Sequence, residues 1–304
     1  MTTATANRPL LAMALRLAAV AVLATLTMGI KYTVDAGVAF PEALFWRQIL
    51  TVPILLAWLA MRGETRRLHT RRFPAQFRRA MMGAVGMGFT FGAPVLLPLA
   101  EATTLGFTTP LFAVIFSALL LKEKIGPYRW AAVAMGFAGV LVIARPDGHL
   151  PLAGSLVGLG AGLMVALISI QIRDLTRTDE PLSIVFWFAA LSSPVLALFL
   201  PFYATSHTTQ QWLLLGGLGI LGCIGQLLLT ASLRYGQVAS VIVMDYSALA
   251  WATFYGWAIW GDTPASSTWL GAPLILAAGL VIVWREHRLG KPPSVEGTLP
   301  AETS

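Results

Sequence analysis

Residues 109–143 read TPLFAVIFSALLLKEKIGPYRWAAVAMGFAGVLVI, and residues 248–282 read ALAWATFYGWAIWGDTPASSTWLGAPLILAAGLVI. Each segment contains an apolar stretch, an acidic residue (Glu123 or Asp262), a turn with proline, a tryptophan (Trp130 or Trp269) and a second apolar stretch with glycine. The interval between the two tryptophans equals the interval between the two acidic residues. This repeat interval indicates an internal repeat, the first feature to establish when a fold is inferred from sequence.

The composition around these segments is that of a membrane protein. Of the 304 residues, 57% are hydrophobic and only 12% are charged, and the mean hydropathy is +0.73. The charged share is about half that of an average soluble protein. A soluble enzyme, a coiled coil and a disordered chain are therefore excluded. The single cysteine, Cys223, excludes a disulfide scaffold.

Ten stretches are long or nearly long enough for a helix to cross the bilayer, which takes about 20 apolar residues. They are apolar on every face, whereas strands of a membrane barrel alternate. The sequence therefore predicts an all-α integral membrane protein with ten transmembrane helices. The predicted spans are Leu10–Ile30, Pro41–Met61, Ala80–Ala100, Thr103–Leu121, Trp130–Ala144, Leu152–Ile172, Leu182–Phe202, Trp212–Leu233, Val238–Trp260 and Thr268–Trp284.

The basic residues predict the orientation. With the N-terminus inside, 18 of the 21 lysines and arginines lie in inner segments; the outer segments hold Lys31 and Arg145, and Arg47 lies within the second span. By the positive-inside rule, both termini are cytoplasmic. This placement also accounts for the net charge of +7 without a nucleic-acid partner. The basic run from Arg62 to Arg79 is interpreted as a topology anchor that contacts anionic lipid.

The repeat predicts how the chain is divided. Residues 1–9 are a short cytoplasmic N-terminus, 10–144 and 152–288 are two five-helix repeats, and 289–304 are a disordered cytoplasmic tail. Because each repeat has an odd number of spans, the second enters the membrane from the opposite side. Inverted repeats of this kind are typical of secondary transporters, whose substrate site lies near the midplane between the halves.

Several features of the chain resemble the EamA-type members of the drug/metabolite transporter superfamily. Lys31 ends the first predicted helix, Pro41 opens the second, and Arg47 follows. The run LLLKEKIGPYRWAAVAMGFAGVLVI resembles the family's fourth-to-fifth helix pattern, and YSALAWATFYGWAIWGDTP (Tyr246–Pro264) is the most similar run in the second half. The resemblance covers nearly the whole chain. It implies ten spans in a five-plus-five arrangement and a carrier of small metabolites, often an exporter of amino acids or related compounds.

Asp245 is the principal candidate site residue, and it departs from the family pattern. An acidic residue inside the ninth predicted helix costs about 2.5–3.5 kcal/mol on insertion scales. It is interpreted as a contact for a substrate ammonium group or a proton; the alternative is a protonated Asp245 bonded to another helix. Gln226 lies at a similar depth on the eighth helix, where it contacts substrate or bonds a neighbouring helix.

Two basic residues are candidates for contact with a substrate carboxylate. The guanidinium group of Arg47 binds carboxylates bidentately. The alternative is that Arg47 reaches the outer surface or pairs with Glu42, Asp35 or Glu101. Lys31 is the second candidate, with an interfacial position as the alternative.

Tyr246, Trp251 and Thr109 complete the candidate substrate-binding residues. The two aromatic side chains lie deep enough to line an amphipathic cavity, or else they pack against lipid. Thr108, Thr109 and Pro110 interrupt the fourth helix, because proline removes a backbone hydrogen bond. Such an interruption can expose carbonyl groups to a substrate; a simple kink is the alternative.

The function predicted is secondary transport in a bacterial inner membrane. We expect export of amino acids or amino-acid-derived zwitterions, an opine-type metallophore among them, with a proton as candidate coupling ion. The alternatives are an importer of a vitamin or nucleoside-like solute, an integral membrane enzyme, and a sensor. Without a phosphate-binding loop or a cluster of metal ligands, no enzyme activity, cofactor or metal is predicted. The partners expected are a small polar metabolite and the lipid bilayer, in a monomer or homodimer.

We expect cysteines introduced near Gly148 and Thr205 to be labelled from outside the cell, and those near Thr70 and Lys291 only from inside. The physical reason is the one-sided distribution of lysine and arginine. Labelling with a membrane-impermeant thiol reagent, in a chain with Cys223 replaced, measures this. A Thr70 position labelled from outside contradicts both the orientation and the inverted repeat.

Overall fold

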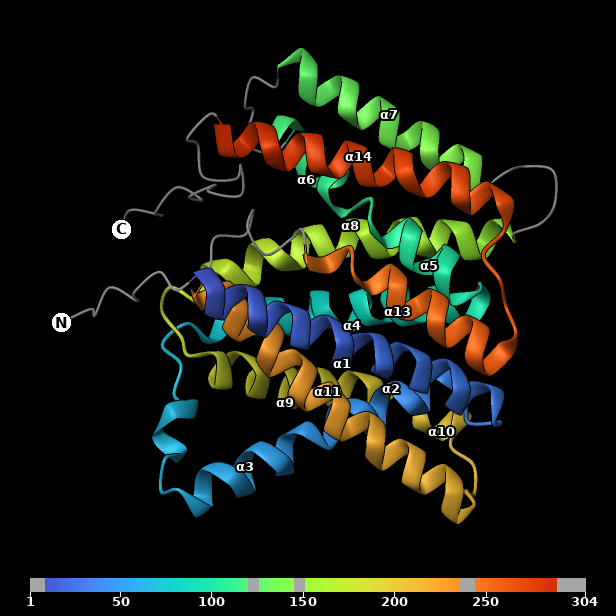
Figure 1. Ribbon diagram of the computed structural model, residues 1–304. Coiled ribbons are helices and arrows are strands. Elements are labelled where there is room, and N and C mark those ends of the chain that lie inside the picture. The colour runs from blue at the N-terminus through green and yellow to red at the C-terminus, as the bar shows by residue number, and fades with distance from the viewer. Residues whose placement is uncertain (1–8, 120–125, 145–150, 236–243, 289–304) are drawn as a thin grey trace.

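Helices form the whole regular structure of the part of the chain that is described. The computed structural model describes residues 9–119, 126–144, 151–235 and 244–288 (Figure 1). The predicted all-α class is confirmed for those residues. In chain order the elements are α1 (Pro9–Asp35), α2 (Phe40–Ile49), α3 (Thr51–Met61), η1 (Thr65–Leu68), α4 (Phe73–Leu96), α5 (Leu99–Gly106), α6 (Thr109–Leu119), α7 (Pro127–Ala144), α8 (Leu152–Leu175), α9 (Pro181–Ala197), α10 (Leu200–Tyr203), α11 (Thr209–Tyr235), α13 (Ala248–Tyr255), η2 (Gly256–Trp260) and α14 (Ser266–Arg288).

Membrane-crossing helices are present in both halves of the chain. Three further apolar helices are shorter, and helix covers most of the described part of each of the ten predicted spans. The number of crossings stays a prediction, and residues 238–243 of the ninth span, Glu123 and the tail 289–304 lie outside the described residues. The five segments long and apolar enough to cross a bilayer are Leu10–Asp35, Phe40–Met61, Leu99–Phe116, Leu152–Leu175 and Thr209–Tyr235.

The helix pairings are the same when the two halves are exchanged. Helix α1, the first span of one half, packs along α11, the third predicted span of the other (Figure 1). Their counterparts α8 and α4 pack along each other in the same way. The last predicted spans, α7 and α14, pair with one another. The fold is thus built from contacts between the halves more than within them.

The predicted end of the third span is wrong, and proline is the cause. The third span was expected to reach Ala100, but α4 ends at Leu96 and α5 begins at Leu99. Pro98 pushes the preceding residue, Leu97, out of the helical region, and its backbone is extended. The second predicted span, Pro41–Met61, matches the apolar segment Phe40–Met61. Within it a single residue, Leu50, separates α2 from α3, where Pro53 has no N–H to donate four residues back.

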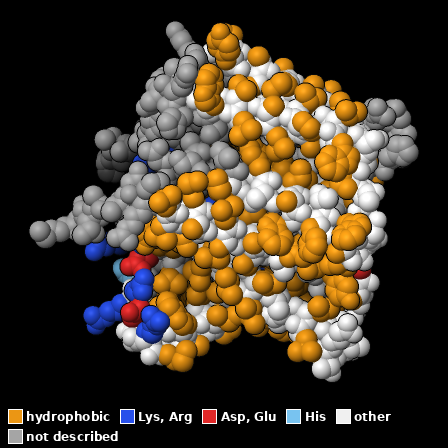
Figure 2. Space-filling model, in the orientation of Figure 1, with side chains coloured by type: hydrophobic (Ala, Val, Ile, Leu, Met, Phe, Trp, Pro, Cys, Tyr) orange, Lys and Arg blue, Asp and Glu red, His pale blue; other side chains and the backbone are white. Residues whose placement is uncertain are grey.

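The face of the molecule seen in Figure 2 is largely apolar where it is coloured. Large hydrophobic side chains that a soluble protein would bury are exposed, including Leu152 and Leu213, each 73% exposed. Exposed apolar area on this scale fits contact with lipid. Basic and acidic side chains gather at one end, where α3 leads into η1 and α4 (Figure 2). Helix α1 begins and α14 ends on that side (Figure 1).

We expect Gly271→Ala to loosen the packing of α7 on α14. A Cβ at Gly271 would lie 2.6 Å from the carbonyl oxygen of Gly139 and 2.5 Å from Cγ1 of Ile143, so one helix must shift. Overpacking of this kind costs about 1–3 kcal/mol. Thermal unfolding in detergent should show a lower melting temperature. Gly216→Ala, where a Cβ meets nothing within 4 Å, is the control and should not lower it.

Candidate functional site

Two helix interruptions occupy equivalent positions in the two halves. Helix α5 ends at Gly106 and α6 begins at Thr109, as the sequence predicted. In the second half a turn at residues 246–247 precedes α13, which begins at Ala248. Thr109 and Ala248 are separated by the same repeat interval as Trp130 and Trp269. The interruptions are therefore a property of the repeat.

Each interruption is capped by the same hydrogen bond. The Thr108 hydroxyl donates to the Leu105 carbonyl oxygen at 2.7 Å, and the Ser247 hydroxyl donates to the Met244 carbonyl oxygen at 2.7 Å. Both bonds run back three residues, and they join equivalent positions of the two copies. The same two carbonyl oxygens also accept the backbone N–H of Thr108 and of Ser247, each at 3.1 Å, so the hydroxyl bonds reinforce both turns.

The interruptions meet through their aromatic residues. Phe107 and Tyr246 are equivalent positions of the repeat, and their rings lie edge to face with centroids 5.2 Å apart. The Tyr246 hydroxyl is buried and has no hydrogen-bond partner among the described residues. It lies against Gly279 of α14, where any Cβ would collide with it. An unpaired hydroxyl at the contact of two interrupted helices is available to a polar solute.

The hydroxyl of Thr109 is engaged within the protein. It donates to the carbonyl oxygen of Gly106 at 2.9 Å and to that of Gly162 at 3.2 Å. The second bond ties the interruption to α8. Glycine is needed at position 162, because a Cβ there would collide with the Thr108 hydroxyl. Thr109 thus stabilises the interruption itself.

Asp245 forms an ion pair with Arg16 of α1. The guanidinium Nε and Nη2 each donate to one carboxylate oxygen at 2.5 Å. The Arg16 side chain is 11% exposed and that of Asp245 is 31% exposed. Asp245 was expected to contact a substrate ammonium group, a proton or another helix; that Arg16 of α1 is its partner could not be predicted, because sequence spacing does not tell which helices are neighbours. Arg16 was visible only as an interruption of the first apolar run. The pair lies directly beside Tyr246.

Trp251 of α13 and Gln226 of α11, the other candidates of the second half, take no part in the ion pair of Arg16 and Asp245. Trp251 is 38% exposed and stacks on Tyr255, with centroids 5.9 Å apart. The Tyr255 hydroxyl hydrogen-bonds that of Thr25 at 2.8 Å, which links α13 to α1. Gln226 is half-buried and forms no hydrogen bond with the residues that the structure describes. No contact joins it to Asp245 within that part of the chain.

Lys31 holds the C-terminal end of α1 against the end of α4. Its ammonium group donates to the carbonyl oxygens of Pro94 and Leu97 at 2.8 and 3.2 Å. The Trp260 ring lies with its centroid 5.5 Å away. Carbonyl groups at a helix end need such donors. The contacts of Lys31 are thus those of a helix-capping residue.

Arg47 is 1% exposed and has no acidic partner among the described residues. Its Nη1 donates to Gln48 Oε1 at 2.8 Å and contacts the Met87 sulfur at 2.6 Å. The guanidinium carbon lies 4.9 Å from the centroid of the Phe91 ring. The nitrogens Nε and Nη2 are buried, and no described residue hydrogen-bonds them. A buried cation in this condition is costly in a membrane protein.

The three acids considered as partners of Arg47 bond elsewhere. Glu42 bonds the ring of His207 at 2.6 Å, and Asp35 accepts from Trp260 Nε1 at 2.7 Å. Glu101 accepts from the hydroxyl of Thr268 at 2.9 Å and from a backbone N–H at the start of α14. Like Arg16, His207 was missed as a partner, because 165 residues separate it from Glu42.

Comparison with known proteins supplies the family context. The model of the EamA-like transporter family matches residues 10–145 and 152–284. A riboflavin transporter of Rhizobium johnstonii is 31% identical, over 84% of this chain and 85% of its own length. The pseudopaline exporter CntI of Pseudomonas aeruginosa is 29% identical, over 86% and 94%. A riboflavin transporter of Vibrio cholerae is 28% identical, over 79% and 81%.

A solved structure is similar in fold. A crystal structure with 22% sequence identity superposes with a TM-score of 0.63, covering 92% of this chain and 99% of the other. At this identity the likeness concerns the fold alone. It extends over both halves of the chain.

We expect Asp245→Asn to lower the melting temperature in detergent, because Arg16 then loses its charged partner. A hydrogen bond between charged groups is worth about 1.5–3 kcal/mol. The double variant Arg16→Gln/Asp245→Asn should be more stable than the sum of the two single changes predicts. If the single effects add without interaction energy, the ion pair does not stabilise the bundle.

Proposed function

Because the chain belongs to the EamA-like transporter family, we propose that it is a secondary transporter of small zwitterionic metabolites. Amino acids and compounds derived from them are the solute class. The observation that carries this proposal is the bidentate pair between Arg16 and Asp245, beside an interrupted helix. Transport proceeds by alternating access, with one half of the bundle moving against the other.

The ion pair offers both halves of a zwitterion a partner. A solute carboxylate takes the place of Asp245 on Arg16, since guanidinium binds carboxylates through two parallel hydrogen bonds. The solute ammonium group takes the place of Arg16 on Asp245. Each charged group of the protein exchanges one partner of opposite charge for another, so the desolvation cost of both charges stays compensated during the exchange. A solute with only one of the two charges leaves one protein group without a partner.

The paired interruptions support a site at this depth. In many secondary transporters the substrate lies where interrupted helices expose backbone groups near the midplane. Here the contact of Phe107 with Tyr246 joins the two interruptions, and the unpaired Tyr246 hydroxyl lies one residue from Asp245. Tyr246 is therefore proposed to contact the solute, with Arg16 and Asp245.

Export across a bacterial inner membrane, with both termini in the cytoplasm, is the proposed direction and setting. The similarity to a protein named as a pseudopaline exporter supports export as the direction. The positive-inside distribution of arginine supports the orientation. A proton is the proposed coupling ion, with Asp245 as the group that binds it when Arg16 is released. One charge driven by 100 mV supplies about 2.3 kcal/mol, enough for a gradient of about forty- to fiftyfold.

Import of a vitamin is the second candidate function. It is favoured by the two relatives named as riboflavin transporters, at 31% and 28% identity. Such a solute is recognised by stacking against aromatic rings more than by charge. Phe107 and Tyr246 provide two adjacent rings. The two candidates thus predict different competitors for the same site.

We expect purified protein in liposomes to exchange a labelled amino-acid-derived zwitterion, and the unlabelled zwitterion to compete. Its methyl ester and its N-acetyl derivative should compete at least about thirtyfold more weakly, since each leaves one buried charge without a partner. Uptake is measured with and without an imposed proton gradient. Riboflavin is the parallel labelled solute.

The Asp245→Asn variant and a surface control separate the outcomes. Asp245→Asn should lose zwitterion exchange, whereas Arg66→Gln, an exposed change in η1, should retain it. Uptake of riboflavin that is unaffected by zwitterions supports the second candidate. Equal competition by the zwitterion and its ester rules out the exchange at Arg16 and Asp245.

A further inference from the structure

A second buried arginine lies close to Arg47. Arg79 of α4 is 3% exposed, and its guanidinium carbon lies 4.2 Å from the centroid of the Phe188 ring. Its nitrogens Nε and Nη1 are buried and have no hydrogen-bond partner among the described residues. Arg79 ends the basic run of the sequence, where it resembles any other anchoring arginine. The structure sets it apart, because its neighbour Arg78 is exposed.

The guanidinium groups of Arg79, from α4, and Arg47, from α2, contact α4 at positions one helical turn apart. Nη1 of Arg79 is directed at Gly83, where a Cβ would collide with it, and Nη1 of Arg47 contacts Met87. Four residues along a helix are about 6 Å of rise. The positive charges are near enough to repel each other. Gly83 and Met87, the residues contacted, lie in the middle of α4, whose 24 residues begin at Phe73.

A chain of hydrogen bonds runs from Arg47 to Phe188, the residue whose ring lies against Arg79. Arg47 donates to Gln48, and Gln48 donates to the Ser192 hydroxyl at 2.8 Å. That hydroxyl donates to the carbonyl oxygen of Phe188, whose ring lies under Arg79. Both side chains are thus held by α2, α4 and α9, and they are not free to turn toward the surface.

Glycine residues provide the space for both side chains. A Cβ at Gly222 of α11 would lie 3.0 Å from Cγ of Arg47 and 3.3 Å from its Nε. A Cβ at Gly83 would lie 2.5 Å from the Phe188 ring as well as on Arg79. The two guanidinium groups are thus accommodated by the helices around them. Four buried nitrogens without partners then face no described carboxylate.

We propose that Arg47 and Arg79 together form a binding site for an oxyanion with two negative charges, of the class of inorganic phosphate or a dicarboxylate. Two fixed positive charges are neutralised by one such ion. The nitrogens of Arg47 that no described residue bonds, Nε and Nη2, share one edge of its guanidinium group and can donate two parallel hydrogen bonds, and Arg79 can donate a further bond from Nε or Nη1. A halide lacks that geometry. The Arg16–Asp245 pair takes no part in this site. An anion bound here accompanies the zwitterionic solute or exchanges for it.

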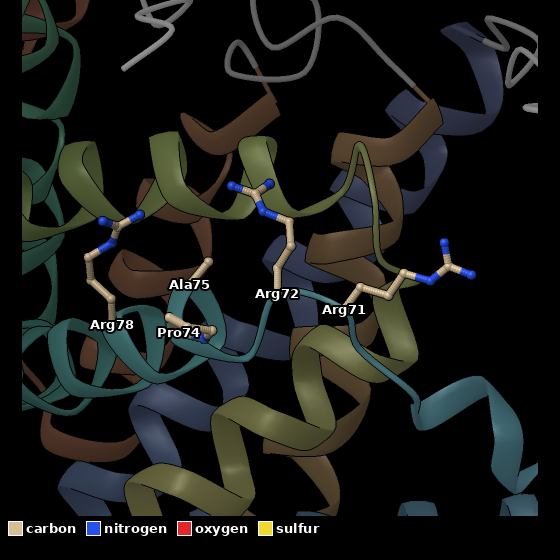
Figure 3. A pocket seen from close by; sticks show the side chains of 5 residues that line it. All are labelled: Arg71, Arg72, Pro74, Ala75 and Arg78. Carbon is tan, nitrogen blue, oxygen red and sulfur yellow. The ribbon is translucent and has the colours of Figure 1, made fainter. Parts of the chain in front are cut away.

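A basic pocket on the surface is the competing location for such an ion. It has a volume of about 360 Å³ and is lined by Arg71, Arg72, Pro74, Ala75 and Arg78 (Figure 3). Arg71 points away from the other two arginines in that view. Arg72 already bonds the Asp174 carboxylate at 2.7 Å. The pocket is exposed, whereas Arg47 and Arg79 are buried, so variants distinguish the two.

The test measures the melting temperature of the detergent-solubilised full chain. Phosphate, succinate and glutarate are titrated separately at constant ionic strength, with acetate and chloride as monovalent controls. We expect at least one dianion to raise the melting temperature saturably, and the monovalent ions not to. The dianion that raises the melting temperature identifies the ligand as phosphate or as a dicarboxylate. If none of the dianions acts, the proposed site does not exist.

Three arginine variants locate the binding. Arg47→Gln and Arg79→Gln should each weaken the response by about thirtyfold or more. Arg78→Gln, adjacent on the same helix, should leave it unchanged. A response lost in Arg78→Gln and retained in the other two places the ion in the surface pocket and overturns the proposal.

The stability of the variants without anion is an independent measurement. Removing one of two buried, mutually repelling charges should raise the melting temperature of Arg79→Gln above that of the parent chain. Arginines with a purely structural role predict a lower value, and that result also overturns the proposal. Transport of zwitterions by the parent chain in liposomes is measured beside it, so a failure of the anion site is distinguishable from a failure of the proposed transport function.

Discussion

Within a bilayer, each peptide group must find its hydrogen-bond partner inside the protein, because hydrocarbon offers none. A continuous helix meets this requirement on its own, but an interrupted one does not. At the two interruptions of this chain the Leu105 and Met244 carbonyl oxygens accept backbone N–H groups, and the hydroxyls of Thr108 and Ser247 add a second bond to each. Thr109 and Lys31 serve other freed carbonyls in the same way. The positions of Phe107, Tyr246 and Asp245 all follow from these capped breaks.

A buried charge likewise needs a partner inside the protein. In the part of the chain that the structure describes, the buried acids considered have such partners, whereas two buried arginines do not. Asp245 is paired with Arg16, and Glu42 with His207, through bonds that join helices distant in sequence. Arg47 and Arg79 are covered by aromatic rings, which attract a cation but do not neutralise it. These acids are thus satisfied within the bundle, while two cations depend on a weaker interaction. This imbalance gives the interior a net positive region on the side of α2, α4 and α9.

The sequence was a good guide wherever a property depends on nearby residues. Apolar length, the repeat interval and the Thr-Thr-Pro run predicted the helices, the repeat and the interruption of the fourth span. Contacts between segments that are distant in the chain could not be predicted from the sequence. Asp245 and Arg16 are 229 residues apart, and nothing in either local pattern links them. Arg79 was hidden for a different reason: it ends a run of surface arginines, and only the rotation of α4 directs it inward.

The two halves are not equivalent at their point of contact. Phe107 faces Tyr246, and Asp245 occupies the position that Gly106 has in the first copy. A carrier assembled from two identical inverted halves would have inward-facing and outward-facing states of equal free energy, because each would be the symmetry image of the other. The Tyr246 hydroxyl and the Asp245 carboxylate are present in the second copy alone, so the two states would differ in free energy. For the alternating-access carrier that we propose, the resting conformation would then be a built-in property of the chain, with one particular side open before any gradient acts on it.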